Sequence, residues 1–313
     1  MKTTLSILAL LVVTIVVADF IYSRVVLARW AKWERGVTRG NDGVRQHCEA
    51  IQQGEGRVAL LLVHGFADSP AVYRKYVPAL AEKGYACHAI RLPGWAQPLE
   101  EMRKVDAEDW RTAIGSELEA LRKTHDEVWV IAHSLGAGLS LELASRGELH
   151  ADGLVAITPM IEVANKRSPV LTPAQWFKVS KALLHLSSVV ESVFAVDMRD
   201  ESMRGNLYRD TFVPRNIYDA LFDVMAGLKG KAKDITLPTL MILAEEDLIV
   251  ETAAADRYFK RLGAAVKKLV VVEDSGHVVP LDHDWEVTTE IIDAFIQAEV
   301  ASAVSEEDGQ IRE

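Results

Sequence analysis

The hydrophobic pattern of this chain begins with a long apolar stretch near the N-terminus. Residues Thr3–Ala18 carry no charge and are almost all apolar, Asp19 interrupts the stretch, and three apolar residues follow it. A helix needs about 20 residues to cross a bilayer. The stretch reaches that length if Asp19 lies near one end, at the level of the headgroups. Residues 1–35 are therefore predicted to form an N-terminal hydrophobic helix that serves as a membrane anchor or a signal segment.

Three interpretations of this stretch are open: a retained single-pass anchor, a cleaved signal peptide with export of the domain, and a helix packed on a soluble domain. Ala18 is a small residue at a suitable cleavage point for a signal peptide. Trp30 and Trp33 stand among basic residues, which is typical of a membrane interface and favours retention. More positive charge follows the span than precedes it, so the positive-inside rule favours a cytoplasmic domain, whereas a cleaved signal would reverse this orientation.

From about Val58 the pattern changes to short apolar runs separated by amphipathic segments. Six runs are predicted to be strands: Val58–Val63, Ala86–Arg91, Val128–Ala132, Leu154–Thr158, Thr239–Ala244 and Lys268–Val272. Several are continuously apolar, as in parallel strands that are covered on both faces. The segments between them place apolar residues at helical spacing. This alternation predicts a mostly parallel, doubly wound α/β sheet in one domain over residues 44–300.

One segment, at about residues 160–238, breaks the alternation because it contains no convincing strand. Apolar residues at helical spacing predict two helices there, one near Trp176–Leu184 and one near Tyr218–Met225. We expect this insertion to cover the C-terminal edge of the sheet, where ligands bind in open α/β folds. The polar and acidic residues 301–313 are predicted to form a flexible tail.

Composition narrows the function classes. The chain has 313 residues, of which 49% are hydrophobic and 26% are charged, so it can form a large ordered domain. Its net charge of -10 disfavours nucleic-acid binding. Neither Cys48 nor Cys87 stands in a C-x-x-C or metal-ligand spacing, and whether they form a disulfide stays open. The sequence has no H-E-x-x-H and no carboxylate cluster at metal spacing, so no metal or cofactor is expected, and no oligomeric state is indicated.

The strongest catalytic signal is the segment Ala132–Gly138 (AHSLGAG), which follows a predicted strand and opens a predicted helix. A tight strand–Ser–helix turn lifts the Ser134 hydroxyl above the sheet and directs the N–H of Leu135 at a developing oxyanion. Such turns usually read G-x-S-x-G, and here Ala132 replaces the first glycine. The alternative is a serine that only caps the helix. The pattern favours Ser134 as the nucleophile.

A second turn that bears on the same chemistry follows the predicted strand Val58–Val63, in the segment His64-Gly65-Phe66. Gly65 allows a sharp turn, so the N–H of Phe66 can face the same point as the N–H of Leu135. Two such donors form an oxyanion hole, in which one donor is worth about 3 kcal/mol. His64 is interpreted as structural, because it precedes the turn and lies on the wrong strand for the base of a triad.

Two further predicted strands end close to candidate catalytic residues. Asp247 follows Thr239–Ala244, and His277 follows Lys268–Val272. The order Ser, Asp, His, each after a strand, is that of an α/β-hydrolase triad. His277 would take the proton of the serine hydroxyl, and Asp247 would orient the ring and stabilise the imidazolium. Rivals for these two roles lie nearby: Glu245, Glu246 and Asp274 for the acid, and His283 for the base.

These motifs resemble those of the bacterial carboxylesterases and monoacylglycerol lipases of the α/β-hydrolase superfamily. The resemblance runs from about Val58 to about Phe295, through LLLVHGFADSP, VWVIAHSLGAG, EEDLIV and DSGHVVPLDHDWEVTTEIIDAFI. It implies an α/β-hydrolase fold whose helical insertion is a cap over the acyl pocket, and oxyanion donors from Phe66 and Leu135. It also implies hydrolysis of short to medium acyl esters, including monoacylglycerols, without a cofactor. Ala132 and Trp95 depart from the pattern, since many relatives have glycine and histidine there.

The sequence therefore predicts a serine hydrolase that cleaves a small-molecule or lipid ester through an acyl-enzyme, and that contacts the membrane through its N-terminal segment. Acyl transfer and the cleavage of a thioester or an amide are reactions that would use the same triad, and they stay open. A non-catalytic binding protein on the same fold is disfavoured, because all three triad residue types are present.

Overall fold

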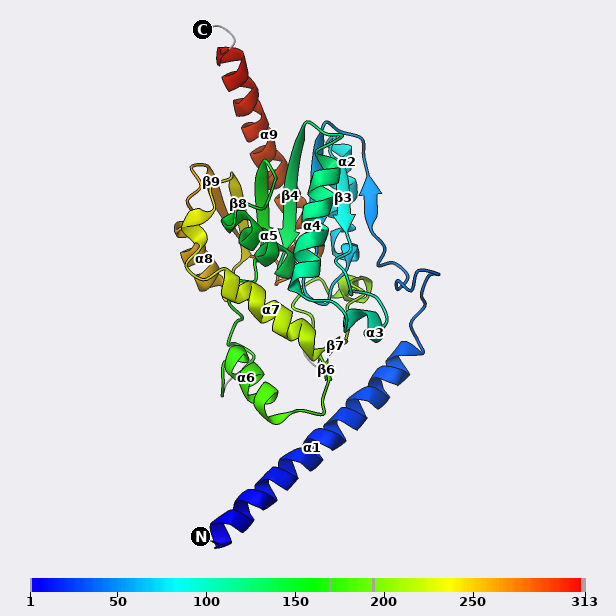
Figure 1. Ribbon diagram of the computed structural model, residues 1–313. Helices are drawn as coiled ribbons and strands as arrows, with labels where there is room; N and C mark the ends of the chain where they lie inside the picture. The colour runs from blue at the N-terminus through cyan, green and yellow to red at the C-terminus, as the bar shows by residue number, and fades with distance from the viewer. Residues whose placement is uncertain (1, 169, 193–194, 311–313) are drawn as a thin grey trace.

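A sheet of seven strands organises the chain in the computed structural model, which describes residues 2–168, 170–192 and 195–310 (Figure 1). The strand order is β1-β3-β2-β4-β5-β8-β9, and each neighbouring pair in this sheet is parallel apart from β1 with β3. The strands are β1 (Ile51–Gln53), β2 (Val58–Val63), β3 (Ala86–Ile90), β4 (Glu127–His133), β5 (Gly153–Ile157), β8 (Thr239–Ala244) and β9 (Lys267–Val272).

The six predicted strands are confirmed to within one residue at each end, and so is the mostly parallel α/β class. Strands β2, β4, β5 and β8 are buried along almost their whole length, which is why their sequences read as continuous apolar runs. Strand β1 is not among the predicted strands. It has three residues, lies at the sheet edge and is partly exposed, so no apolar run marks it.

Helices cover both faces of the sheet, and each face has its own apolar core. One core includes α4 (Ala107–Leu121), α5 (Leu135–Ser145), α7 (Arg215–Gly227) and α8 (Thr252–Lys260). The other includes α2 (Tyr76–Glu82) and α9 (Trp285–Gln310). The short helix α3 (Leu99–Met102) and four 3-10 turns, at 70–73, 201–206, 232–234 and 279–281, complete the connections.

The insertion at about residues 160–238, called the cap from here on, lies beyond the C-terminal ends of the strands (Figure 1). It contains the two predicted helices, α6 (Pro173–Leu183) and α7. The prediction that it contains no strand is wrong, because β6 (Val189–Glu191) and β7 (Phe212–Pro214) form an antiparallel pair. Each has only three residues and pairs with the other outside the main sheet, so no period-two pattern is long enough to reveal them.

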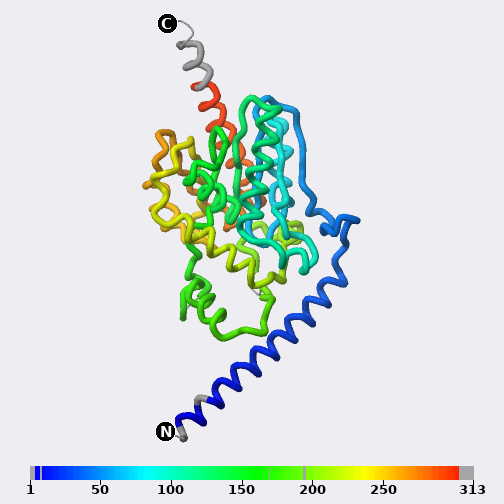
Figure 2. Tube along the Cα trace, in the orientation of Figure 1, coloured from blue at the N-terminus to red at the C-terminus, as the bar shows by residue number. Residues whose placement is uncertain are grey.

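Helix α1 (Lys2–Glu34) is continuous, and its N-terminal half extends away from the rest of the chain (Figure 2). It is long and apolar enough to cross a membrane, with a mean hydropathy of 2.6 over 18 residues. The predicted N-terminal hydrophobic helix is therefore confirmed as a helix. Its C-terminal half packs on the cap, where Val26 joins Leu99, Val189 and Phe212 in a small apolar cluster.

The predicted flexible tail, residues 301–313, overlaps the end of α9. Residues up to Gln310 continue α9, and residues 311–313 lie outside the described part of the chain. The segment contains alanine and glutamate, which favour helix, and no proline that would end one. Its polar composition therefore reflects a helix that projects beyond the domain, as Figure 1 shows.

The two cysteines are free and buried, which answers the question of a disulfide. Burial raises the pKa of the Cys87 thiol to about 12. The thiolate is the reactive form of cysteine, so this side chain acts as a small apolar residue in the core.

Candidate active site

The turn between β4 and α5 holds Ser134 in a strained conformation. Its φ is 54° and its ψ is -114°, and the next residue begins α5. A non-glycine residue in such a conformation costs on the order of 1–3 kcal/mol, and persists only where the surroundings enforce it. As a result, the chain turns sharply between β4 and α5, and the Ser134 hydroxyl lies at the C-terminal edge of the sheet.

Glycines enforce this turn by close packing. A Cβ on Gly136 would lie 2.4 Å from the main-chain oxygen of Val63, so no other residue fits there. A Cβ on Gly65 would lie 2.9 Å from the Cβ of Ser134. Ala132, by contrast, is buried inside β4 and its methyl group is part of the core beside the sheet. The departure from G-x-S-x-G is therefore accommodated by packing.

The structure brings Ser134, His277 and Asp247 together, although 143 residues separate the serine from the histidine. The distance from Ser134 Oγ to His277 Nε2 is 2.8 Å, and the distance from His277 Nδ1 to Asp247 Oδ2 is 2.7 Å. Because a carboxylate only accepts, Nδ1 carries the proton that is donated to Asp247, and Nε2 accepts from the serine hydroxyl. The three side chains are buried.

The other oxygen of Asp247 is held by the chain that follows it. Oδ1 accepts hydrogen bonds from the main-chain N–H groups of Ile249 (2.7 Å) and Val250 (2.8 Å). These bonds fix the carboxylate so that Oδ2 faces the imidazole. The rival acids and the rival base do not share this position, since their side chains are exposed: Glu245, Glu246, Asp274 and His283.

The two predicted oxyanion donors lie at neighbouring strand ends. In the parallel register of β2 and β4, Val63 pairs with Ala132, so the loops that start at His64 and His133 run side by side. Leu135 is the first residue of α5, and the N–H groups of a first helical turn have no intrahelical acceptor. Phe66 follows Gly65, the residue packed against Ser134. Both N–H groups are thus on segments that adjoin the hydroxyl.

Comparison with known proteins agrees with this arrangement. A family model described as serine aminopeptidase, S33, matches residues 54–284. This chain belongs to the S33 serine hydrolase family. The match covers the sheet from β2 to β9, the cap and the segments that carry Ser134, Asp247 and His277, whereas α1 and β1 lie outside it. The predicted resemblance to serine hydrolases of the α/β-hydrolase superfamily is therefore confirmed.

Individual relatives of this S33 hydrolase share about a quarter of its residues. The chain is 27% identical to the thermostable monoacylglycerol lipase of Bacillus sp. (strain H-257), over 77% of this chain and 91% of that protein. It is 25% identical to the carboxylesterase of Bacillus subtilis (strain 168), over 77% of this chain and 93% of that protein. The crystal structure of the monoacylglycerol lipase of Paleococcus ferrophilus has the same fold, with a TM-score of 0.67 at 20% identity over 80% of this chain and 98% of that chain.

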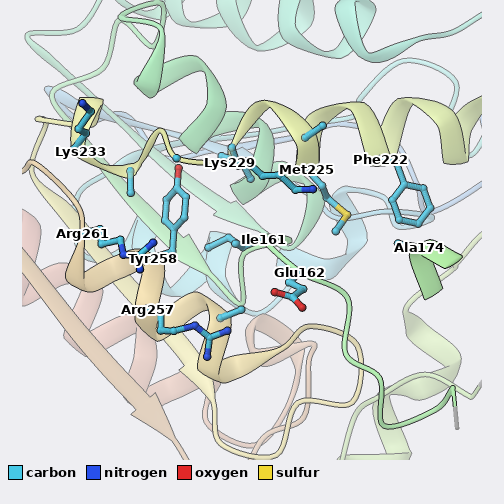
Figure 3. Close-up of a pocket in the computed structure, with 15 residues that line it drawn as sticks. Ile161, Glu162, Ala174, Phe222, Met225, Lys229, Lys233, Arg257, Tyr258 and Arg261 are labelled. Atoms are coloured by element: carbon cyan, nitrogen blue, oxygen red, sulfur yellow. The ribbon is translucent and has the colours of Figure 1, made fainter. Parts of the chain in front are cut away.

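A cavity of about 810 Å³ lies between α7 and α8 (Figure 3). Its fifteen described lining residues include no triad residue and neither oxyanion candidate. Tyr258 and Arg261 from α8 and the following turn line it, as do Phe222 and Met225 from α7. Two lining residues connect the cavity to the loop of Asp247, because the main-chain oxygen of Glu162 accepts from the N–H of Glu251 and the N–H of Ala254 donates to the main-chain oxygen of Glu251.

Asp197, in the cap, is a residue of the site that the sequence patterns do not reveal. Its Oδ2 accepts hydrogen bonds from the N–H of Leu248 (2.7 Å) and the N–H of His277 (3.2 Å). One carboxylate therefore ties the loop after β8 to the loop after β9. No motif could have revealed it, because its partners are main-chain groups far away in sequence.

Three further hydrogen bonds hold the histidine loop. The main-chain oxygen of His277 accepts from the Nε2–H of His133 (3.0 Å) and from the hydroxyl of Thr158 (3.0 Å). Buried Asp282 accepts from the N–H of Gly276 (2.8 Å). The imidazole is thus fixed by its own backbone as well as by Asp247.

His64 is structural, as the sequence suggests. Its Nδ1–H donates to the main-chain oxygen of Gly65 (2.9 Å), and its Nε2 accepts from the N–H of Leu92 (3.1 Å). Burial lowers the pKa of His64 to about 4, because the charged imidazolium would lose its hydration. His133 is also buried, and its pKa lies well below the usual value for the same reason.

We expect His64 to make the fold sensitive to acid. In the unfolded chain histidine binds a proton near pH 6.5 and in the folded chain near pH 4, so unfolding takes up a proton between these values. Stability from this residue is complete above pH 6.5 and falls as the pH falls, by about 2 kcal/mol at pH 5. Chemical denaturation of the detergent-solubilised protein at pH 7 and at pH 5 measures the difference in the free energy of unfolding between the two pH values. The difference should shrink by about that amount in His64→Gln, and an unchanged difference would contradict the assignment.

We expect Asp197→Ala to lower kcat by about 10- to 100-fold with little change in KM, because the imidazole moves relative to Ser134. Asp197→Asn should recover part of the rate, since the amide oxygen still accepts from both N–H groups. Steady-state kinetics on a soluble ester measures both variants. Asp200→Ala is the control, since the Asp200 side chain accepts from Ser202 in the same segment and pairs with Lys75. Equal losses for Asp197→Ala and Asp200→Ala would rule out positioning by Asp197.

Proposed function

We propose that this S33 hydrolase cleaves short to medium acyl esters, including monoacylglycerols and other lipid-derived esters, with Ser134, His277 and Asp247 as its triad. The observation that carries the proposal is the hydrogen-bonded path from Ser134 Oγ through the His277 ring to Asp247, with distances of 2.8 and 2.7 Å. Serine becomes a good nucleophile only when a base lies within such reach. The relatives named monoacylglycerol lipase and carboxylesterase support the substrate class.

The reaction follows from the tautomer of His277. Ser134 Oγ attacks the ester carbonyl carbon while its proton passes to Nε2, and Asp247 stabilises the imidazolium that forms. The carbon–oxygen bond to the alcohol then breaks, and the alcohol leaves with the proton from Nε2. Water, deprotonated by the same nitrogen, attacks the acyl-enzyme and releases the acid and the free serine.

The N–H groups of Phe66 and Leu135 are proposed to stabilise the negative oxygen of each tetrahedral intermediate. A donor in this role lowers the barrier by about 3 kcal/mol. The Phe66 main-chain segment is held in place by Arg209, which donates to the Phe66 oxygen (2.9 Å). That bond uses the Phe66 oxygen, and the N–H is proposed to face the substrate.

The acyl chain is proposed to lie between the sheet edge and the cap. The ring of Phe66 contacts Trp95, with centroids 5.0 Å apart, and Tyr218 of α7, with centroids 5.1 Å apart. Trp95, which stands where many relatives have histidine, stacks on Trp110 and is fully buried. This aromatic wall beside the nucleophile loop suits an apolar chain.

The proposal is tested by labelling and turnover of the full chain. A fluorophosphonate probe should label the protein, and Ser134→Ala should abolish labelling and lower ester hydrolysis by about 10⁴-fold or more, because the nucleophile is lost. Labelling that persists in Ser134→Ala would refute the assignment of the nucleophile. Product analysis with added alcohol distinguishes hydrolysis from acyl transfer, and turnover of matched thioester and amide substrates shows whether the triad cleaves those bonds faster than an ester.

We also propose that α1 is retained as a single-pass anchor, with the domain on the cytoplasmic side. Support comes from the unbroken helix through Ala18 and from the packing of its C-terminal half on the cap. Cleavage after Ala18 would put a fraying helix end at Asp19, where that contact begins.

Mass spectrometry of protein from the membrane fraction tests retention. An N-terminal peptide that begins at Met1 or Lys2 is the expected result, because a retained anchor keeps its first residues. A peptide that begins at Asp19 would instead support a cleaved signal segment.

A further inference from the structure

Asp19 is a carboxylate within an exposed apolar helix, yet only 2% of it is exposed. Its oxygens accept hydrogen bonds from the main-chain N–H groups of Leu186 (2.7 Å) and Ser187 (3.1 Å), and from the Ser187 hydroxyl. The hydroxyl of Ser23, one helical turn further on, donates to the main-chain oxygen of Leu186 (3.1 Å). A buried carboxylate is costly unless it is hydrogen-bonded, so these bonds hold α1 at one place on the cap.

The helix is held to the cap at a second point as well. Arg29 forms an ion pair with Glu191 of β6 (2.9 Å), and the ring of Trp33 lies 5.8 Å from that of Phe212 in β7. Two separated contacts on one rigid helix fix its direction relative to the cap. The residues before Asp19 have no such support: Leu5 and Leu10, for example, are 71% and 68% exposed.

The cap itself carries a row of exposed apolar side chains, called the cap stripe. It consists of Trp176, Val179, Leu183 and Leu186, which are 47%, 37%, 44% and 49% exposed. Trp176, Val179 and Leu183 follow one another by three or four residues, so they share one face of α6, and Leu186 lies in the segment just after the helix. Another side of α6 is turned to α7, because Phe177 stacks on Phe222 with centroids 4.5 Å apart. Soluble proteins seldom leave such a contiguous apolar row in water.

The cap stripe adjoins the point where the apolar half of α1 ends. Leu186 is the last residue of the stripe, and its N–H is the group bonded to Asp19. Asp19 is also the first charged residue after the apolar stretch, so it marks the depth at which hydrocarbon gives way to headgroups. Figure 1 shows α6 on the same side of the domain as the N-terminal half of α1.

We propose that the cap stripe lies in the headgroup–acyl boundary of the phospholipid bilayer that α1 spans, and that the Asp19 contact holds it at that depth. The cap stands between this surface and the end of the sheet where Ser134 lies, so a lipid ester reaches the active site from the membrane. This inference rests on the proposed anchoring of α1. It commits to lipid as the occupant of the stripe, because the stripe continues the surface of a membrane-spanning helix.

The location of the stripe is tested first, without any measurement of activity. The full chain is reconstituted into phosphatidylcholine vesicles that contain lipid brominated on the acyl chains, which quenches nearby tryptophan. Trp176 should contribute to the quenched fluorescence, so Trp176→Phe should show a smaller quenched fraction than the wild type. Equal quenched fractions in the two proteins would overturn the proposal and leave a protein partner as the occupant.

The role of the stripe is tested by comparing two substrates. Val179→Gln/Leu183→Gln should keep the rate on 4-nitrophenyl acetate in water within about twofold, because both side chains are at the surface. The same variant should lose about tenfold on monooleoylglycerol embedded in vesicles, since less apolar area enters the lipid. Val287→Gln, at a residue of α9 that is 48% exposed, is the matched control and should behave as the wild type on both substrates.

The contact at Asp19 is tested by Asp19→Leu, which lengthens the apolar stretch and so preserves membrane insertion. It should nevertheless show the same selective loss on the embedded ester and reduced quenching of Trp176, because the cap is no longer held at the surface. Wild-type rates in Asp19→Leu would refute the role of this contact. If the wild type cleaves neither ester, the proposed function fails, whereas the quenching result still decides where the stripe lies.

Discussion

Close packing at the ends of β2 and β4 is the constraint on which the site depends. The first turn of α5 approaches the main-chain oxygens of Val63 and His64 so closely that only glycine fits at position 136. This approach goes together with the positive φ of Ser134 and places the start of α5 beside the loop of Phe66. The same close packing thus brings the proposed nucleophile and the proposed oxyanion donors to adjacent segments.

Buried carboxylates then join the parts of the site that the sheet alone does not connect. Asp247 binds the imidazole and the two N–H groups that follow it, and Asp197 bridges the loops after β8 and β9. Asp282 connects the histidine loop to the segment after Asp197, since it accepts from the N–H groups of Gly276 and Arg199. Asp197 and Asp282 thus join the cap segment to the loops that carry Asp247 and His277, so a movement of the cap would also move these loops.

The sequence reveals features that rest on local pattern and misses those that rest on distant main-chain partners. Buried parallel strands such as β2 and β8 are readable because both faces are apolar. The segments of Ser134 and Asp247 are readable because each follows such a strand, and that of His277 follows the apolar run of the edge strand β9. Asp197 is invisible in the sequence, because its partners are amides 51 and 80 residues away. The continuation of α9 to Gln310 is not readable for a different reason: a polar composition fits a solvated helix as well as a tail.

The packing of α1 on the cap has a consequence for handling the protein. Removing residues 1–35 to obtain a detergent-free sample would uncover Val189 and Phe212, which are 2% and 5% exposed in the complete chain. It would also leave the N–H groups of Leu186 and Ser187 without the carboxylate of Asp19 that accepts from them. A truncated preparation would therefore differ from the full-length enzyme in the cap. Its measured preference among acyl-chain lengths would then differ from that of the full-length enzyme. Nanodiscs or mild micelles keep this contact and are the proper setting for profiling.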